Sequence, residues 1–273
     1  MEGLIELFSY PFMFRALVTG TAISLCAALL GVILVLKRYS MIGHGLADVA
    51  FAAVSLAVAL GLSPSMHIFI TLPIVILASF VIMSLTRKGA KGDVAIGMVS
   101  TGSLAAGVII TAAAKGFNVD IYNYMFGSIL ASSKGDMYMS IVLTVIVLVV
   151  FSAFYNRLFI ITYDESFAEA SGINVTFYQF MISFLTALTI VIGMKIMGTL
   201  LISSLIIFPA VTGKRLVKSF KSLVICASVV SVIAFLAGLF ASYLLNLPTG
   251  ASIVGANIVI CGVVSLCTIK TNK

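Results

Sequence analysis

Charge is what this sequence has least of. Only 9% of its 273 residues are Asp, Glu, Lys or Arg, whereas a soluble domain of this length carries roughly a quarter. Hydrophobic residues make up 62%, and they form continuous runs along the whole chain, which excludes a soluble domain with one anchor. A bilayer absorbs that much apolar surface, and its hydrocarbon requires backbone groups to pair internally. Because the runs do not alternate with polar residues, we predict an all-α integral membrane protein.

Residues that carry chemistry are scarce as well. The chain has two His, no Trp and four Cys, and the cysteines all fall inside apolar runs without metal-ligand spacing. We therefore predict free, buried thiols at Cys26, Cys226, Cys261 and Cys267. Two His cannot assemble the ligands and base of an H-E-x-x-H intramembrane protease within one chain. The chain also has no G-x-x-x-x-G-K-[ST] loop, so we expect no enzyme, and any ATP must be hydrolysed by another subunit.

Nine apolar segments approach the roughly 17 to 25 residues that a membrane-spanning helix needs. They are Phe12–Leu36, Leu46–Leu62, Met66–Leu85, Val94–Ala114, Met137–Tyr155, Val175–Gly193, Ile196–Thr212, Leu223–Leu245 and Ala251–Ile269. Several are short, and eight spans result if one is re-entrant. A further apolar patch, Ile121–Ala131, is too short to span. No soluble domain or long linker interrupts the pattern, so we expect residues 1–273 to form a single transmembrane domain.

The net charge of +7 reflects basic clusters between the apolar runs, such as Lys37 and Arg38. These clusters mark membrane topology rather than a nucleic-acid surface. If nine spans alternate and the C-terminus is cytoplasmic, 12 of the 16 Lys and Arg lie inside. The sequence therefore predicts a polytopic bundle of eight or nine helices with the N-terminus outside and the C-terminus inside.

Polar side chains near the spans are few, and His44 and Asp48 are the most informative pair. At helical spacing, residues i and i+4 share one face, so the two side-chain heads can converge. An imidazole nitrogen and a carboxylate oxygen suit Zn²⁺, Mn²⁺ or Fe²⁺, and a second copy of the chain would supply two more ligands across a two-fold axis. The alternative is an ion pair near a helix start, where Asp also favours the dipole. For the other histidine, His67, a structural or capping role competes with a metal role.

The segment Tyr163–Asn174 contains three carboxylates and reads as a short amphipathic helix closed by Gly172. It is either a solvated connector or a docking helix for a cytoplasmic partner, with Phe167 as the apolar anchor. The docking interpretation assigns this role to Asp164, Glu165, Phe167, Glu169 and Gly172.

The stretch from Lys195 to Ala210 is rich in small residues. Gly198, Ser203 and Ser204 either allow close helix packing or line a transport pathway. Pro209 is expected to bend or end the helix.

Together these segments resemble the membrane permease of the zinc/manganese/iron class of ABC importers. The family's Gly-Asp-x-x-x-His motif after the first span matches Ser40 to Phe51, and its acidic cytoplasmic loop resembles Asp164 to Gly172. Its Gly-x-Leu-Leu and Pro-Ala stretch is matched by Gly198–Leu201 and Pro209–Ala210. Segments 93–97 and 124–130 are also similar, so the resemblance covers roughly residues 10 to 265.

The resemblance implies a homodimer, two cytoplasmic ATP-binding subunits, an extracellular metal-binding protein and a multi-pass location in the prokaryotic cell membrane. It also implies that the acidic loop is the coupling helix seated on the ATPase. One departure is clear: the family pattern has Asp first and His four residues later, whereas this chain has His44 first and Asp48 second. The exchange keeps one nitrogen and one oxygen ligand per subunit. It swaps their positions along the helix, and therefore how deep each ligand lies in the membrane.

We therefore predict an ATP-driven importer subunit that carries Zn, Mn or Fe as substrate, with no permanently bound cofactor. One alternative is a permease for a metal chelate on the same scaffold. Another is an ion-coupled secondary carrier, which predicts an inverted repeat and acids in mid-membrane. The sequence contains no convincing repeat, and Asp48 is the only acid expected within a span.

Overall fold

The computed structural model describes residues 11–63, 66–87, 92–113, 127, 129 and 132–271. Within these residues the regular structure is helical, and nine helices are long and apolar enough to cross a membrane. These are α2 (Pro11–Leu36), α3 (Ile42–Ala59), α4 (His67–Arg87), α5 (Gly92–Ala113), α7 (Lys134–Ala153), α10 (Val175–Met197), α11 (Thr199–Leu216), α12 (Phe220–Leu245) and α13 (Thr249–Thr271). Two short helices, α8 (Tyr155–Tyr163) and α9 (Glu165–Ala170), connect α7 to α10. The all-α class and the larger of the two predicted span numbers are thus confirmed.

The predicted spans differ from the helices mainly at their ends. Helix α3 begins at Ile42 rather than Leu46, so both His44 and Asp48 lie within it. Helix α11 continues through Pro209 to Leu216, so this proline does not end the helix. The apolar patch Ile121–Ala131 lies outside the described residues apart from 127 and 129.

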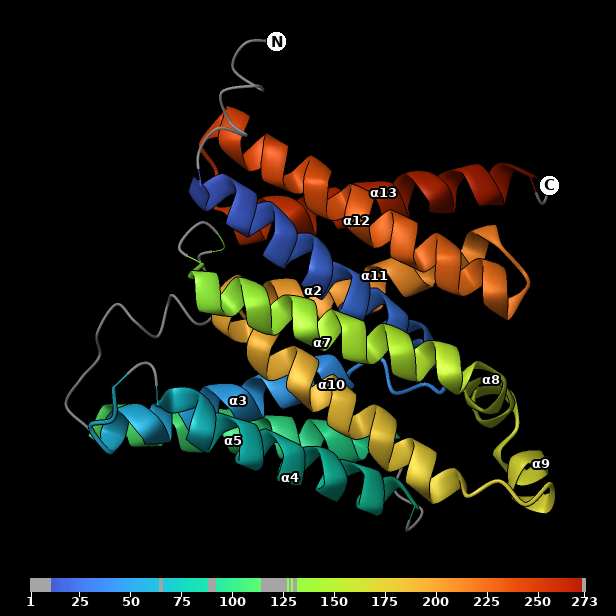
Figure 1. The fold of residues 1–273 in the computed structure, drawn as a ribbon, viewed down its shortest axis with the longest axis horizontal. Coiled ribbons are helices and arrows are strands. Elements are labelled where there is room, and N and C mark those ends of the chain that lie inside the picture. Colours follow the sequence, from blue (N-terminus) through green and yellow to red (C-terminus); the bar gives the residue numbers. More distant parts are fainter. Residues whose placement is uncertain are drawn as a thin grey trace.

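The long helices run back and forth along the longest axis of the molecule (Figure 1). Helix α2 contacts α7, α11 and α12, whereas α3 packs against α4 and α5. Small residues permit the closest approaches. At Gly31 of α2, an added Cβ would lie only 2.1 Å from the carbonyl oxygen of Ile206 on α11. Because that atom belongs to the backbone, any larger residue at Gly31 would force the two helices apart.

The two ends of the bundle differ. One end, which we call the α9 end, holds α8, α9 and the α2–α3 corner (residues 37–41) (Figure 1). The other end, which we call the α7 end, is where α2, α7 and α11 begin (Figure 1). The distribution of Lys and Arg predicts that the α9 end faces the cytoplasm.

The cysteines correct one expectation in part. All four are free, as predicted, but only Cys26 is buried. Cys226 and Cys261 are partly exposed and Cys267 is exposed, because they lie on helices whose outer faces contact no other part of the described chain. An apolar run therefore predicts membrane burial, not burial within the protein.

Candidate metal pair and docking helix

The first turn of α3 is wedged between two other helices. A Cβ added at Gly43 would lie 2.9 Å from Ile206 Cδ1 of α11, and one added at Gly45 would lie 2.7 Å from Ile96 Cγ2 of α5. The two glycines therefore let α3 approach both neighbours closely. The side chain between them, His44, is left facing outward and is 54% exposed.

His44 and Asp48 lie together, as their spacing predicts. His44 Nε2 is 3.8 Å from Asp48 Oδ2, and the Asp48 side chain is only 13% exposed. The same carboxylate oxygen accepts a hydrogen bond from the Ser100 hydroxyl of α5. Ser100 thereby fixes the orientation of the carboxylate from a second helix, and the imidazole is left accessible at the protein surface.

This pair offers one nitrogen and one oxygen ligand of the kind that divalent transition metals take. Among the described residues, no group of three or more His, Cys, Asp or Glu side chains could hold a metal ion. The described part of one chain therefore supplies two ligands here, fewer than a four-ligand site requires.

His67, at the start of α4, lies in a structural environment. Its side chain is buried, and Nε2 is 3.0 Å from the carbonyl oxygen of Leu62 in the preceding turn. Its own carbonyl accepts a hydrogen bond from the Thr71 hydroxyl at 2.8 Å. This arrangement favours the structural interpretation of His67 over the metal interpretation.

Helix α9 has the form that the acidic segment predicts. Asp164 caps it, since the carboxylate accepts a hydrogen bond from Phe167 N at 2.9 Å. After the helix, Gly172 adopts a φ of +77°, and Ile173 N donates to Ala168 O at 3.0 Å. Ala168 is buried against the protein while Phe167 is 58% exposed.

Two of the acidic residues of this segment differ in their surroundings. Glu169 is exposed, whereas Glu165 Oε1 lies 2.6 Å from Lys37 Nζ and accepts a hydrogen bond from Gln179 Nε2 at 2.9 Å. Burial lowers the pKa of Lys37, and the nearby Glu165 carboxylate opposes that shift. Glu165 therefore binds inward to the protein, a contact that the sequence did not indicate.

The proposed pathway residues surround the junction of α10 and α11. Gly198 joins the two helices directly with a φ of +84°, a conformation that favours glycine. Ser203 and Ser204 are buried, and their hydroxyls donate to carbonyls of their own helix, Thr199 O and Leu201 O. These bonds fit helix packing, and a role in lining a pathway stays a prediction.

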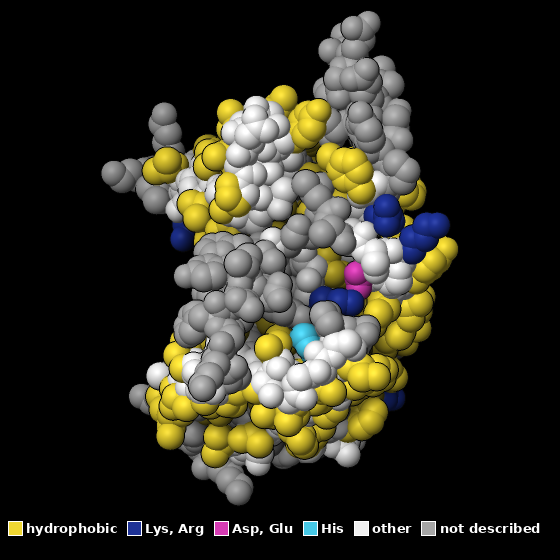
Figure 2. All heavy atoms as spheres, turned by 90° about the vertical axis from the view of Figure 1, so that its left-hand side faces the viewer, with side chains coloured by type: hydrophobic (Ala, Val, Ile, Leu, Met, Phe, Trp, Pro, Cys, Tyr) yellow, Lys and Arg dark blue, Asp and Glu magenta, His cyan; other side chains and the backbone are white. Residues whose placement is uncertain are grey.

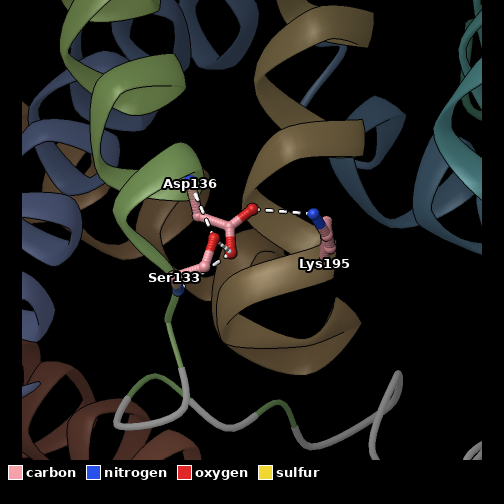
Figure 3. Close-up of polar contacts among 3 residues, drawn as sticks. All are labelled: Ser133, Asp136 and Lys195. Atoms are coloured by element: carbon pink, nitrogen blue, oxygen red, sulfur yellow. Dashed lines mark hydrogen bonds and ion pairs between the residues drawn. The ribbon is translucent and has the colours of Figure 1, made fainter. Parts of the chain in front are cut away.

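A second ion pair, at the α7 end, was missed from the sequence. Lys195 Nζ of α10 lies 2.7 Å from Asp136 Oδ1 of α7 (Figure 3). The other carboxylate oxygen accepts hydrogen bonds from Ser133 N at 3.1 Å and Ser133 Oγ at 2.7 Å. Asp136 N donates in return to Ser133 Oγ at 3.1 Å, and the two reciprocal backbone bonds form a capping box. Asp136 is thus a second buried acid within a span, although Asp48 was expected to be the only one. The Ser133-x-x-Asp136 spacing could have indicated the helix cap at Asp136, but not its pairing with Lys195.

Seen from the α7 end, the described surface is largely hydrophobic, and an acidic side chain lies against a basic one near a histidine (Figure 2). Lys195 and His67 line the same small pocket.

Comparisons with known proteins cover nearly the whole chain. The model of the ABC 3 transport family matches residues 9–268. The manganese import system permease protein ScaB of Streptococcus gordonii is 32% identical over 255 residues, which is 93% of this chain and 90% of ScaB. The high-affinity zinc uptake system membrane protein ZnuB of Haemophilus influenzae is 31% identical over 245 residues, 90% of this chain and 93% of ZnuB.

A solved structure has the same fold. PsaBC from Streptococcus pneumoniae, solved in complex with Fab, contains a chain that superposes with a TM-score of 0.83 at 30% identity. The superposition covers 96% of this chain and 94% of that chain.

Proposed function

Because the chain belongs to the ABC 3 transport family and is the membrane permease subunit of a metal importer, we propose that His44 and Asp48 bind its transported ion. The substrate is a divalent transition metal, Zn²⁺, Mn²⁺ or Fe²⁺, which arrives from outside the cell and is released inward. The relatives act on manganese and zinc by name, and the nitrogen and oxygen ligands of this pair suit either ion.

The observation that carries the proposal is that the side chains of His44 and Asp48 converge, with the His44 imidazole exposed at the protein surface and the Asp48 carboxylate largely buried beside it. The two side chains supply an incomplete ligand set, and the imidazole is open to a partner. A second copy, related by a two-fold axis, presents the same patch and completes a four-ligand site between the subunits. The protein therefore works as a homodimer in the prokaryotic cell membrane.

Separate ATP-binding subunits hydrolyse the ATP that drives transport through this site. We assign their docking contact to α9, because Phe167 is exposed on a helix whose opposite face is anchored by the buried Ala168. Asp164 and Glu169 flank this anchor with negative charge, and Gly172 lets the chain turn sharply back towards α10. ATP binding or hydrolysis then rocks the subunits, and an extracellular metal-binding protein delivers the ion.

The inverted order of the two ligands is accommodated by Ser100. In this chain the deeper ligand is the carboxylate, and a buried carboxylate needs hydrogen-bond donors. The Ser100 hydroxyl supplies one from α5. The exchange of His and Asp relative to the family pattern is therefore compatible with an ordered carboxylate.

Metal uptake in cells that carry single substitutions tests the site. His44→Ala and Asp48→Ala should each lower uptake by about 100-fold or more, since even residues outside the first ligand shell cost 10- to 100-fold. The matched control is His67→Gln, which alters the other histidine and should leave uptake close to wild type. Unchanged uptake in the His44 and Asp48 variants, at normal expression, would remove the site assignment.

Equilibrium binding of free Mn²⁺ or Zn²⁺ to the purified dimer separates an ion permease from a chelate permease. We expect binding that is lost in Asp48→Ala. A dimer that transports metal only as a chelate would bind neither free ion.

A further inference from the structure

The α2–α3 corner lies between the docking helix and the metal pair. Lys37 and Tyr39 extend α2 through hydrogen bonds from their backbone N–H groups to Ile33 O at 3.0 Å and Leu34 O at 2.8 Å. On its far side, Tyr39 O accepts a hydrogen bond from Ile42 N at 3.0 Å, at the start of α3. The corner is thus bonded to both helices, and His44 lies in the first turn that follows it.

Lys37 connects this corner to α9. Its side chain is 6% exposed, and its ammonium lies 2.6 Å from Glu165 Oε1, whose side chain is 45% exposed. Among the residues that the structure describes, no second carboxylate lies within ion-pair distance of Lys37. Gln179 of α10 donates to the same oxygen of Glu165. A buried ammonium with one carboxylate strongly favours keeping that carboxylate in place.

Tyr39 connects the corner to α5. A Cβ added at Gly92 would lie 2.6 Å from Tyr39 Cε1, so the ring packs directly on the first turn of α5. Helix α5 carries Ser100, which holds the Asp48 carboxylate. The corner therefore contacts both helices that position Asp48.

We propose that Lys37 is a positioning residue that couples α9 to the metal pair by tying Glu165 to the α2–α3 corner. When the ATP-binding subunits displace α9, Glu165 draws Lys37 and the corner with it. The first turn of α3 then moves relative to α5, which shifts His44 and Asp48 relative to Ser100. This inference rests on the proposed function for the roles of α9 and of His44 and Asp48.

The test uses the complete complex, with its ATP-binding subunits, reconstituted in proteoliposomes that contain a fluorescent metal indicator. The measured quantity is the amount of Mn²⁺ or Zn²⁺ transported per ATP hydrolysed. Lys37→Met and Glu165→Gln should each lower this ratio by about tenfold or more, the size of a typical coupling between sites. ATP hydrolysis itself should continue. The matched control is Arg38→Gln, which removes an equal charge from the adjacent, exposed position and should leave the ratio unchanged.

A structural defect would give a different result. It would lower ATP hydrolysis, complex assembly and metal binding together, whereas loss of coupling lowers only the transported amount. The double variant Lys37→Glu/Glu165→Lys restores an ion pair at the same place, and the Gln179 amide can rotate to offer its oxygen to the exchanged lysine. We expect this double variant to recover part of the ratio that each single substitution loses.

If Lys37→Met does not assemble, Gln179→Leu tests the same connection, because it keeps both charges and removes only the amide that holds Glu165. A smaller fall in the ratio is expected there. Normal ratios in Glu165→Gln and Gln179→Leu would overturn the inference. The proposed function fails separately, through unchanged metal binding in Asp48→Ala, and that result does not depend on Lys37.

Discussion

Among the described residues, each end of the bundle holds one lysine–carboxylate pair, and the burial of the partners is reversed between them. At the α9 end, Lys37 is 6% exposed and Glu165 is 45% exposed. At the α7 end, Lys195 is 41% exposed and Asp136 is 12% exposed. The N···O distances, 2.6 and 2.7 Å, are nearly equal. Distance alone therefore does not distinguish the two pairs, but the identity of the buried charge does.

The cost of breaking an ion pair depends on which charge is left behind. A buried charge without a partner is strongly destabilising, whereas an exposed one returns to water. The pairs also differ in their other bonds. Asp136 keeps two hydrogen bonds from Ser133 when Lys195 is removed. Lys37 Nζ makes no hydrogen bond among the described residues, so the ion pair with Glu165 is the polar contact that it loses.

The largest effect on stability is expected from Glu165→Gln. This substitution leaves the buried Lys37 ammonium without its carboxylate and should destabilise the permease by about 2 kcal/mol. The value lies below that for fully buried pairs because Glu165 is half exposed. Since the chain has no Trp, unfolding is best followed with a thiol-reactive dye in a background where the three accessible cysteines, Cys226, Cys261 and Cys267, are replaced by Ser. The dye then reacts only with the buried Cys26 as unfolding exposes it.

Lys37→Met is the internal control for that experiment. It removes the same ion pair but leaves Glu165, which is half exposed and still accepts a hydrogen bond from Gln179. Its melting temperature should fall less than that of Glu165→Gln. Equal falls would show that burial does not decide the cost at this end.

At the other end, Lys195→Met should have an intermediate effect of about 1 kcal/mol. The buried Asp136 carboxylate loses its cation but keeps the hydrogen bonds from Ser133 N and Ser133 Oγ. The same dye assay measures the change. A loss as large as that of Glu165→Gln would mean that the capping box does not compensate for the missing cation.

The sequence predicted the helices well because their signal is local. Long apolar runs fixed the positions of nine spans, and only their ends were displaced. Helix α8 was missed because Tyr155–Tyr163 has only nine residues and includes Asn156 and Arg157, so it forms no apolar run of spanning length. The break at Phe154, where φ is −109° and ψ is 15°, leaves no proline or glycine as a marker.

The candidate site was predictable to the extent that its contacts are local. His44 and Asp48 are four residues apart, and Asp164 and Gly172 mark the ends of one short helix. Ser100, in contrast, meets Asp48 from 52 residues away, and Asp136 meets Lys195 across 59 residues. Such contacts depend on which apolar helices are neighbours, and helices of similar composition do not encode that order in any short motif.

The smallest effect is expected from Asp136→Asn, at about 0.5 kcal/mol. The half-exposed Lys195 turns to water, and the amide oxygen still accepts from Ser133, so the start of α7 stays capped. Ser133→Ala is the comparison variant, because it removes the cap but keeps the ion pair and should cost about 1 kcal/mol. Melting temperatures of both variants, measured beside that of Lys195→Met, rank the Asp136 carboxylate, the Ser133 hydroxyl and the Lys195 ammonium by their contribution to stability. If Asp136→Asn is more damaging than Lys195→Met, the charge of the carboxylate stabilises the α7 end directly, and the reversed burial of the two pairs does not control their energetics.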